Sequence, residues 1–184
     1  MKMDELKEKT AASRYVYHGK ILKLREDQAQ MPDGKIYDRE VVEHPGGVGI
    51  ALEDEDGKFF FVTQWRYAQK TVTLEYPAGK REPGEDDLHT AQREIIEETG
   101  YEGTDWKYLG LIYPTPAYDT ETIGMYYAKK GKFIGQNLDE DEAINLSKLS
   151  LDEITDKIVK GEVHDSKTIA MTFLVKEKKE KGIL

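Results

Sequence analysis

Cysteine is absent from the 184-residue sequence, which excludes disulfide bonds, a thiol nucleophile and a zinc–thiolate site. The sequence also lacks any run of about 18 apolar residues, the length that a transmembrane helix needs. Residues 1–13 are charged and carry no apolar segment of the kind found in signal peptides. From these absences we expect a cytoplasmic protein that does not enter a membrane.

Positive charge is scarce as well, since 27 Lys and Arg stand against 36 Asp and Glu, for a net charge of −9. A surface that binds nucleic acid would be basic, and an anionic membrane surface attracts basic segments. We therefore expect neither nucleic acid nor a membrane as a partner. The length suits one domain, or one domain with a small appendage.

The most informative stretch is 79–101, which reads GKREPGEDDLHTAQREIIEETGY. It predicts a loop with glycine and proline followed by one helix. Asp86 or Asp87 can cap the start of this helix, and Gly100 stands where a left-handed residue would end it. An apolar stripe at helical spacing is expected to face a core. The stripe consists of Leu88, Ala91, Ile95 and Thr99.

Acidic residues gather on a neighbouring arc of the same helix. Glu94, Glu97 and Glu98 are three or four positions apart, and Glu85 enters from the loop. Like charges at this spacing repel, which Arg93 relieves in part and a divalent cation would relieve further. Magnesium takes oxygen ligands, often one or two carboxylates with substrate phosphates. On composition alone, the arc could equally be a solvated acidic face.

The full spacing favours a metal site over a solvated face. It reads G-x5-E-x7-R-E-[apolar]-x-E-E-x-G, and seven fixed identities match by chance with a probability on the order of 10⁻⁷. This pattern resembles the box of the Nudix hydrolase family. Tyr101 stands where the family usually has an aliphatic residue, and an aromatic ring can fill the same apolar position. The residues that match are Gly79, Glu85, Arg93, Glu94, Ile95, Glu97, Glu98 and Gly100.

The resemblance extends beyond the box to one branch of the family, the ADP-ribose pyrophosphatases. It rests on residues 39–46, on Gln64-x-Arg66-Tyr67, on residues 75–79 and on Pro114-x-Pro116, where Pro116 follows Gly100 by sixteen positions. The resemblance implies Mg²⁺-dependent cleavage of ADP-ribose to AMP and ribose 5-phosphate, with Mn²⁺ as a substitute. It also implies an α/β (α+β) fold of mixed β-sheets sandwiched between helices. An N-terminal antiparallel strand region would form a homodimer.

The same resemblance implies a role for each matching residue. The metal ligands would be Glu94, Glu98, Glu142 and the Ala78 carbonyl, supported by Glu85 and Glu97. Arg93 would orient the box carboxylates, and Glu140 would be the catalytic base. The substrate residues would be Arg66 at the phosphates, Glu121 at the terminal ribose, Pro116 and Tyr118 in the same loop, and Arg39 serving the neighbouring active site of a dimer.

The acidic loop at residues 138–142 allows more than one interpretation. Alternation in an extended loop would direct Glu140 and Glu142 to different sides, but spacing does not assign their roles, and the loop could be solvated. An EF-hand starting at Asn137 is excluded, because its sixth position would be Glu142 rather than glycine and its twelfth Lys148 rather than glutamate. Arg66 is expected to end a strand just before the box loop, and on its own it could equally form a surface ion pair.

The substrate loop departs from the branch pattern, because Ala117 replaces a glycine and Tyr118 adds a ring. Another nucleoside diphosphate sugar, or a dinucleotide polyphosphate, therefore stays an alternative substrate. A nucleotide sensor without activity is disfavoured by the intact box.

Proline and paired glycines at 44–47 indicate a boundary. We expect a dimerisation region at 1–44 and a Nudix hydrolase domain at 45–184. Residues 1–12 could form a short helix or a loose arm. Strands are expected at about 14–17, 20–24, 35–43, 48–52, 59–65, 72–74, 106–113, 122–128 and 143–148, and closing helices at about 151–160 and 165–178.

Overall fold

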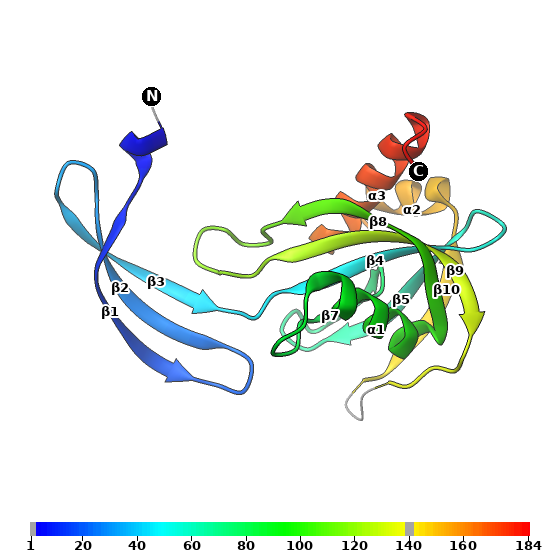
Figure 1. Cartoon of the computed structure of the whole chain (residues 1–184), viewed down its shortest axis with the longest axis horizontal. Helices are drawn as coiled ribbons and strands as arrows, with labels where there is room; N and C mark the ends of the chain where they lie inside the picture. The colour runs from blue at the N-terminus through cyan, green and yellow to red at the C-terminus, as the bar shows by residue number, and fades with distance from the viewer. Residues whose placement is uncertain (1–2, 139–141) are drawn as a thin grey trace. The chain divides into compact units, whose positions relative to one another are not determined.

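The computed structural model describes residues 3–138 and 142–184 (Figure 1). The chain divides into two compact units. The first contains the residues up to Gly46 together with 113–121, and the second contains 47–112 and 122–184. Within the described ranges, no helix is both long and apolar enough to cross a membrane.

The first unit is built on an antiparallel sheet of three strands in the order β1-β2-β3, within the described residues. The strands are β1 (Lys9–His18), β2 (Lys23–Gln30) and β3 (Ile36–Glu43), preceded by the 3-10 helix η1 (Met3–Leu6). Asp33 shapes the turn between β2 and β3, since its Oδ1 accepts a hydrogen bond from the Lys35 N–H at 3.0 Å.

Two sequence-based expectations for this unit are wrong. Residues 9–12 are strand rather than helix or loose arm, and β2 runs on to Gln30 instead of ending near residue 24. Both errors concern polar segments without an apolar alternation. Backbone pairing holds them in place, for example Lys9 opposite Gln30 and Thr10 opposite Ala29.

The second unit contains a mixed sheet, seven-stranded in the described part of the chain, in the order β10-β5-β4-β9-β8 with β6 on β5 and β7 on β4. Strands β4 and β9 are parallel. The elements are β4 (Gly47–Glu53), β5 (Phe59–Arg66), β6 (Thr71–Glu75), β7 (Ala78–Lys80), β8 (Tyr101–Ile112), β9 (Ile123–Phe133), β10 (Ile144–Leu149), α1 (Asp87–Thr99), α2 (Leu151–Val159) and α3 (Ser166–Glu180).

Two apolar cores surround this sheet, and together they confirm the predicted layering of mixed sheet between helices. One core packs Ala91 and Ile95 of α1 against β4 residues such as Ile50. The other joins Ile154 of α2 and Met171 of α3 to a second group of sheet residues. Alternate residues of β5 serve the two cores, since Phe60 belongs to the first, and Phe59 and Phe61 to the second.

Helix α1 begins and ends where the sequence predicts. Asp86 caps it by accepting from the His89 N–H at 2.8 Å, and Gly100 ends it with φ 77° while donating to the Ile96 carbonyl. A Cβ on residue 100 would lie 2.9 Å from the backbone nitrogen of Gln136, so both conformation and space require glycine. Leu88 is the exception in the predicted apolar stripe. It is 38% exposed, because it lies in the first turn beside the exposed loop 82–84.

Candidate active site

The site is organised by the close approach of α1 to the short strand β7. Glu98 Oε2 accepts a hydrogen bond from the Ala78 N–H at 2.9 Å. A Cβ built on Gly79 would fall 1.7 Å from the carboxyl carbon of Glu94. Two carboxylates one helical turn apart therefore lie against the same strand, and any residue other than glycine at 79 would displace one of them.

Both carboxyl groups are buried, since Glu94 is 9% and Glu98 2% exposed. Burial raises the pKa of Glu94 to about 7 and that of Glu98 to about 8. The charge of Glu142 raises both pKa values further, although Glu142 itself is exposed. A solvated acidic face is therefore the wrong description of these two residues. A cation would stabilise their ionised forms.

Arg93 connects the helix to the loop before it. Its Nε donates to Glu85 at 2.9 Å, and its Nη1 donates to Glu94 at 2.8 Å and to Glu97 at 2.7 Å. Nη2 also donates to the Lys80 carbonyl at 3.0 Å. The guanidinium lowers the pKa of Glu85 to about 2. Arg93 thus fixes the orientation of three carboxylates.

The donor atoms present here fit a hard divalent cation. They are carboxylate and backbone oxygens, the ligands that Mg²⁺ prefers, and Mg²⁺ usually takes one or two carboxylates with water and phosphate. In the described ranges, no three Asp, Glu or His side chains form a ready-made metal cluster. Glu94 and Glu98 supply the pair of carboxylates, while Glu140 lies outside the described residues.

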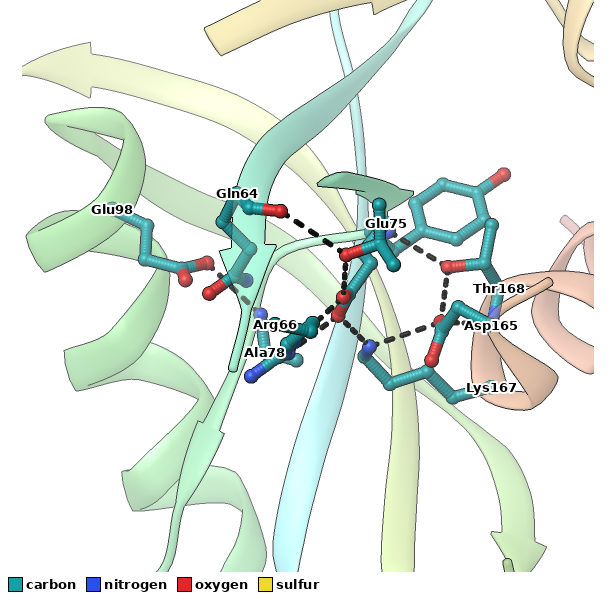
Figure 2. Close-up of polar contacts among 10 residues, drawn as sticks. Gln64, Arg66, Glu75, Ala78, Glu98, Asp165, Lys167 and Thr168 are labelled. Atoms are coloured by element: carbon teal, nitrogen blue, oxygen red, sulfur yellow. Dashed lines mark hydrogen bonds and ion pairs between the residues drawn. The ribbon is translucent and has the colours of Figure 1, made fainter. Parts of the chain in front are cut away.

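Arg66 ends β5, as predicted, and its guanidinium is engaged by a residue that the sequence analysis missed. Nε and Nη2 donate to the two carboxylate oxygens of Glu75, at 2.7 and 2.5 Å. Figure 2 shows that Lys167 reaches the same carboxylate from α3. Burial would raise the pKa of Glu75, but Arg66 and Lys167 hold that pKa at about 2.

The N-terminus of α3 continues this network. Lys167 Nζ lies 2.9 Å from Asp165 Oδ2, and the Thr168 hydroxyl accepts from the Tyr76 N–H at 3.0 Å (Figure 2). Asp165 also caps the helix by accepting from the Thr168 N–H. Glu75 could have been found from its place in the motif at 75–79. No local sequence pattern identifies Lys167 as a site residue, because its partner Glu75 is 92 positions away in the sequence.

Four of the expected substrate residues belong to the first unit. Arg39 donates to Glu8 at 3.0 and 3.1 Å, and Glu121 lies 3.4 Å from His44 Nδ1. Tyr118 lies in the same loop as Pro116, and its backbone carbonyl accepts from the Val42 N–H at 2.7 Å. The residue is 55% exposed. The structure therefore groups these residues with the three-stranded sheet and the box residues with the second unit.

Comparison with known proteins assigns the chain to a family. The family model described as NUDIX domain matches residues 43–171, and the one described as nucleoside diphosphate sugar hydrolase N-terminal domain matches residues 8–42. The chain is 38% identical to the methanol dehydrogenase activator of Bacillus methanolicus, over 91% of this chain and 92% of that one. It is 33% identical to the ADP-ribose pyrophosphatase of Bacillus subtilis (strain 168), over 90% and 91%.

A solved structure shows the same fold. The crystal structure of an ADP compounds hydrolase superposes with a TM-score of 0.83 at 18% identity and covers 97% of each chain. At this identity the likeness concerns the fold alone. The box geometry, the NUDIX match over most of the chain and the identity to curated relatives lead to one conclusion: the chain belongs to the Nudix family.

Proposed function

We propose that this protein hydrolyses the diphosphate of ADP-ribose to AMP and ribose 5-phosphate, with Mg²⁺ as the metal and Mn²⁺ as a substitute. The observation that carries the proposal is the pair of buried carboxylates, Glu94 and Glu98, held against the strand at Gly79. Relatives named ADP-ribose pyrophosphatase, from B. subtilis and from Mycobacterium tuberculosis at 32% identity, support the substrate.

Nudix hydrolases generally need a divalent metal ion. When bound, such an ion neutralises diphosphate oxygens and activates water for attack at phosphorus. Its ligands would be Glu94, Glu98, Glu142 and the Ala78 carbonyl. A base must also take the proton of the attacking water, and we assign this role to Glu140 by its position in the family pattern.

The remaining residues hold the site and receive the substrate. Arg93 keeps the box carboxylates in orientation while Glu85 and Glu97 balance its charge. Arg66 uses two of its N–H groups on Glu75, and the others can donate to a substrate phosphate. The ribose end would be received by Glu121, Pro116 and Tyr118, with Arg39 contributed to the neighbouring subunit of a dimer.

Another nucleoside diphosphate sugar is the alternative substrate. Two observations favour it: the description of the family model at residues 8–42, and a relative named GDP-mannose pyrophosphatase at 28% identity over 76% of this chain. The replacement of a branch glycine by Ala117 is consistent with a changed ribose contact. The chemistry and the box residues would be the same for both substrates.

The direct test is hydrolysis of ADP-ribose in ¹⁸O-labelled water with Mg²⁺, followed by mass spectrometry. We expect AMP and ribose 5-phosphate, one of them carrying the label and so marking the phosphorus attacked. GDP-mannose and a dinucleotide polyphosphate are the comparison substrates. A kcat/KM for either that exceeds the value for ADP-ribose would contradict the proposed preference.

Replacing either buried carboxylate should separate activity from stability. Glu94→Gln and Glu98→Gln should each reduce kcat on the order of 100-fold, the scale on which losing one electrostatic contact to the transition state acts. The melting temperature without metal should stay the same or rise, because a buried carboxylate is removed. Glu55→Gln, an exposed carboxylate paired with Lys130, is the control and should change neither. Near-normal turnover in the Glu94 or Glu98 variant would refute the metal-site assignment.

The two glutamates of the acidic loop should respond differently to Mg²⁺. Glu140→Gln should lower kcat by about 10²–10⁴-fold, the usual cost of losing a general base, and added Mg²⁺ should not restore it. Glu142→Gln should weaken metal affinity, so excess Mg²⁺ should recover part of the activity. Parallel Mg²⁺ titrations of the activity of the two variants distinguish the general base from the metal ligand. Rescue of the Glu140 variant instead would reverse the two roles.

We also propose that residues 1–44 are the dimerisation region and 45–184 the hydrolase domain. The support is apolar surface on the first unit, whose three-stranded sheet is too small to bury a core of its own. The large apolar side chains exposed by 41–60% there include Tyr15, Val16, Tyr17, Ile21, Leu22, Ile36 and Tyr37. A second copy of the chain would cover them.

Sedimentation equilibrium at micromolar concentration should therefore give a dimer. Val16→Asp should shift the equilibrium to monomer by placing a charge on the apolar surface. Phe173→Asp, on an apolar residue of α3 that is 62% exposed against 41% for Val16, is the control and should leave the dimer intact. A monomeric wild-type protein would exclude both the dimer and the shared-site role of Arg39.

A further inference from the structure

One buried carboxylate in the second unit is shared by two cations. Glu75 has a side chain that is 2% exposed, and it accepts from Arg66 on one side and from Lys167 on the other (Figure 2). The Thr73 hydroxyl donates to it as well, at 2.5 Å. Because every contact to Glu75 is directional, its carboxylate is fixed in one orientation.

The two cations differ in their access to solvent. The side chain of Arg66 is 41% exposed, whereas that of Lys167 is 6% exposed. Arg66 therefore can meet a ligand with the N–H groups that Glu75 leaves, and for these no further partner exists in the described part of the chain. Lys167 is too buried to reach a ligand, so it acts through the carboxylates around it. It contacts Glu75 and Asp165, and its charge acts to lower the pKa of Glu98.

The segment that follows Glu75 is tethered at each residue. The Tyr76 N–H donates to Thr168 at 3.0 Å, the Pro77 carbonyl accepts from the Ile50 N–H at 2.8 Å, and the Ala78 N–H donates to Glu98. The N-terminus of α3, strand β4 and the box helix α1 thus hold residues 75–78 between them. Moving Glu75 would also disturb the strand on which the box carboxylates rest.

The charges explain why a lysine is needed here. Arg66 and Lys167 balance Glu75 and Asp165, beside the acidic box residues Glu94 and Glu98. Without Lys167, Glu75 would be neutralised by Arg66 alone, and the cluster would carry one net negative charge. A diphosphate is itself an anion, so that change would oppose its binding.

We propose that Lys167 is a positioning residue for the diphosphate of the substrate, because by holding Glu75 it fixes the exposed edge of Arg66 that binds a phosphate. The inference rests on the proposed function in taking the ligand to be a diphosphate and Arg66 to be a residue that meets its phosphate. A purely structural ion pair would stabilise the fold equally well but would leave the affinity for phosphate unchanged. The two roles therefore differ in a binding measurement.

The experiment measures binding of inorganic pyrophosphate in Mg²⁺ by calorimetry, so that it does not depend on turnover. Lys167→Met should raise Kd about tenfold, the size found when a supporting partner of a site residue is removed. Lys148→Met is the matched control, because it also removes a lysine from a buried carboxylate, that of Asp54. It should lower the melting temperature without changing Kd. A control that weakens binding as much as Lys167→Met would overturn the proposal.

A double-mutant cycle tests whether Lys167 acts through Glu75. Glu75→Gln should also raise Kd, because losing the fixed orientation of Arg66 outweighs the removal of one negative charge. Adding Lys167→Met to it should raise Kd further by much less than about tenfold. This double variant keeps the charges of Arg66 and Asp165 balanced, so it remains informative if Lys167→Met alone does not fold. The positioning role is refuted if the losses of affinity from the two substitutions multiply independently. It is also refuted if Lys167→Met folds and has an unchanged Kd.

The wild-type activity is measured separately. If wild type binds pyrophosphate with this pattern of losses but does not cleave ADP-ribose, the proposed function fails and the role of Lys167 stands. If wild type cleaves ADP-ribose and Lys167→Met retains the wild-type Kd, the proposed function stands and the role of Lys167 falls.

Discussion

The constraint on which the second unit depends is the burial of two carboxyl groups against one short strand. Glu94 and Glu98 can lie there because residue 79 has no side chain and because the Ala78 N–H faces Glu98. Burial makes ionisation of both groups unfavourable when they are alone. A cation bound at the proposed metal site would relieve this unfavourable electrostatic energy, which arises from the packing of α1 on β7.

Two sets of contacts keep this arrangement in place from opposite sides. Arg93 holds the loop side by binding Glu85, Glu94 and Glu97 together. The other side is held by Glu75 and its two cations, which belong to β5 and α3. Both sets consist of charged hydrogen bonds, which are stronger than neutral ones and more demanding in geometry. Precision at the box is therefore supplied by residues outside it as well as within it.

Features encoded locally could be predicted from the sequence. The bounds of α1 follow from Asp86 and Gly100, whose capping chemistry acts over a few residues. The box follows from the spacing of its residues, and the layering of sheet and helices follows from the family resemblance that this spacing carries. The end of β5 at Arg66 was also correctly placed.

Features that depend on distant partners could not be predicted. Burial of Glu94 and Glu98 requires β7, a three-residue strand with no apolar alternation of its own. The polar start of β1 is strand only because β2 pairs with it. Lys167 looks like an ordinary residue in the first turn of a helix until the fold brings it to Glu75.

The contact between Tyr76 and Thr168 has a consequence for how the protein is made. These residues are 92 positions apart, and contacts of such long range form late because a large loop must close first. During synthesis the whole box leaves the ribosome before α3 does, since chains emerge N-terminus first. A nascent or C-terminally truncated chain therefore carries every box residue while the strand beneath them still lacks its second anchor. The segment that leads into the box is fully anchored only when α3 docks.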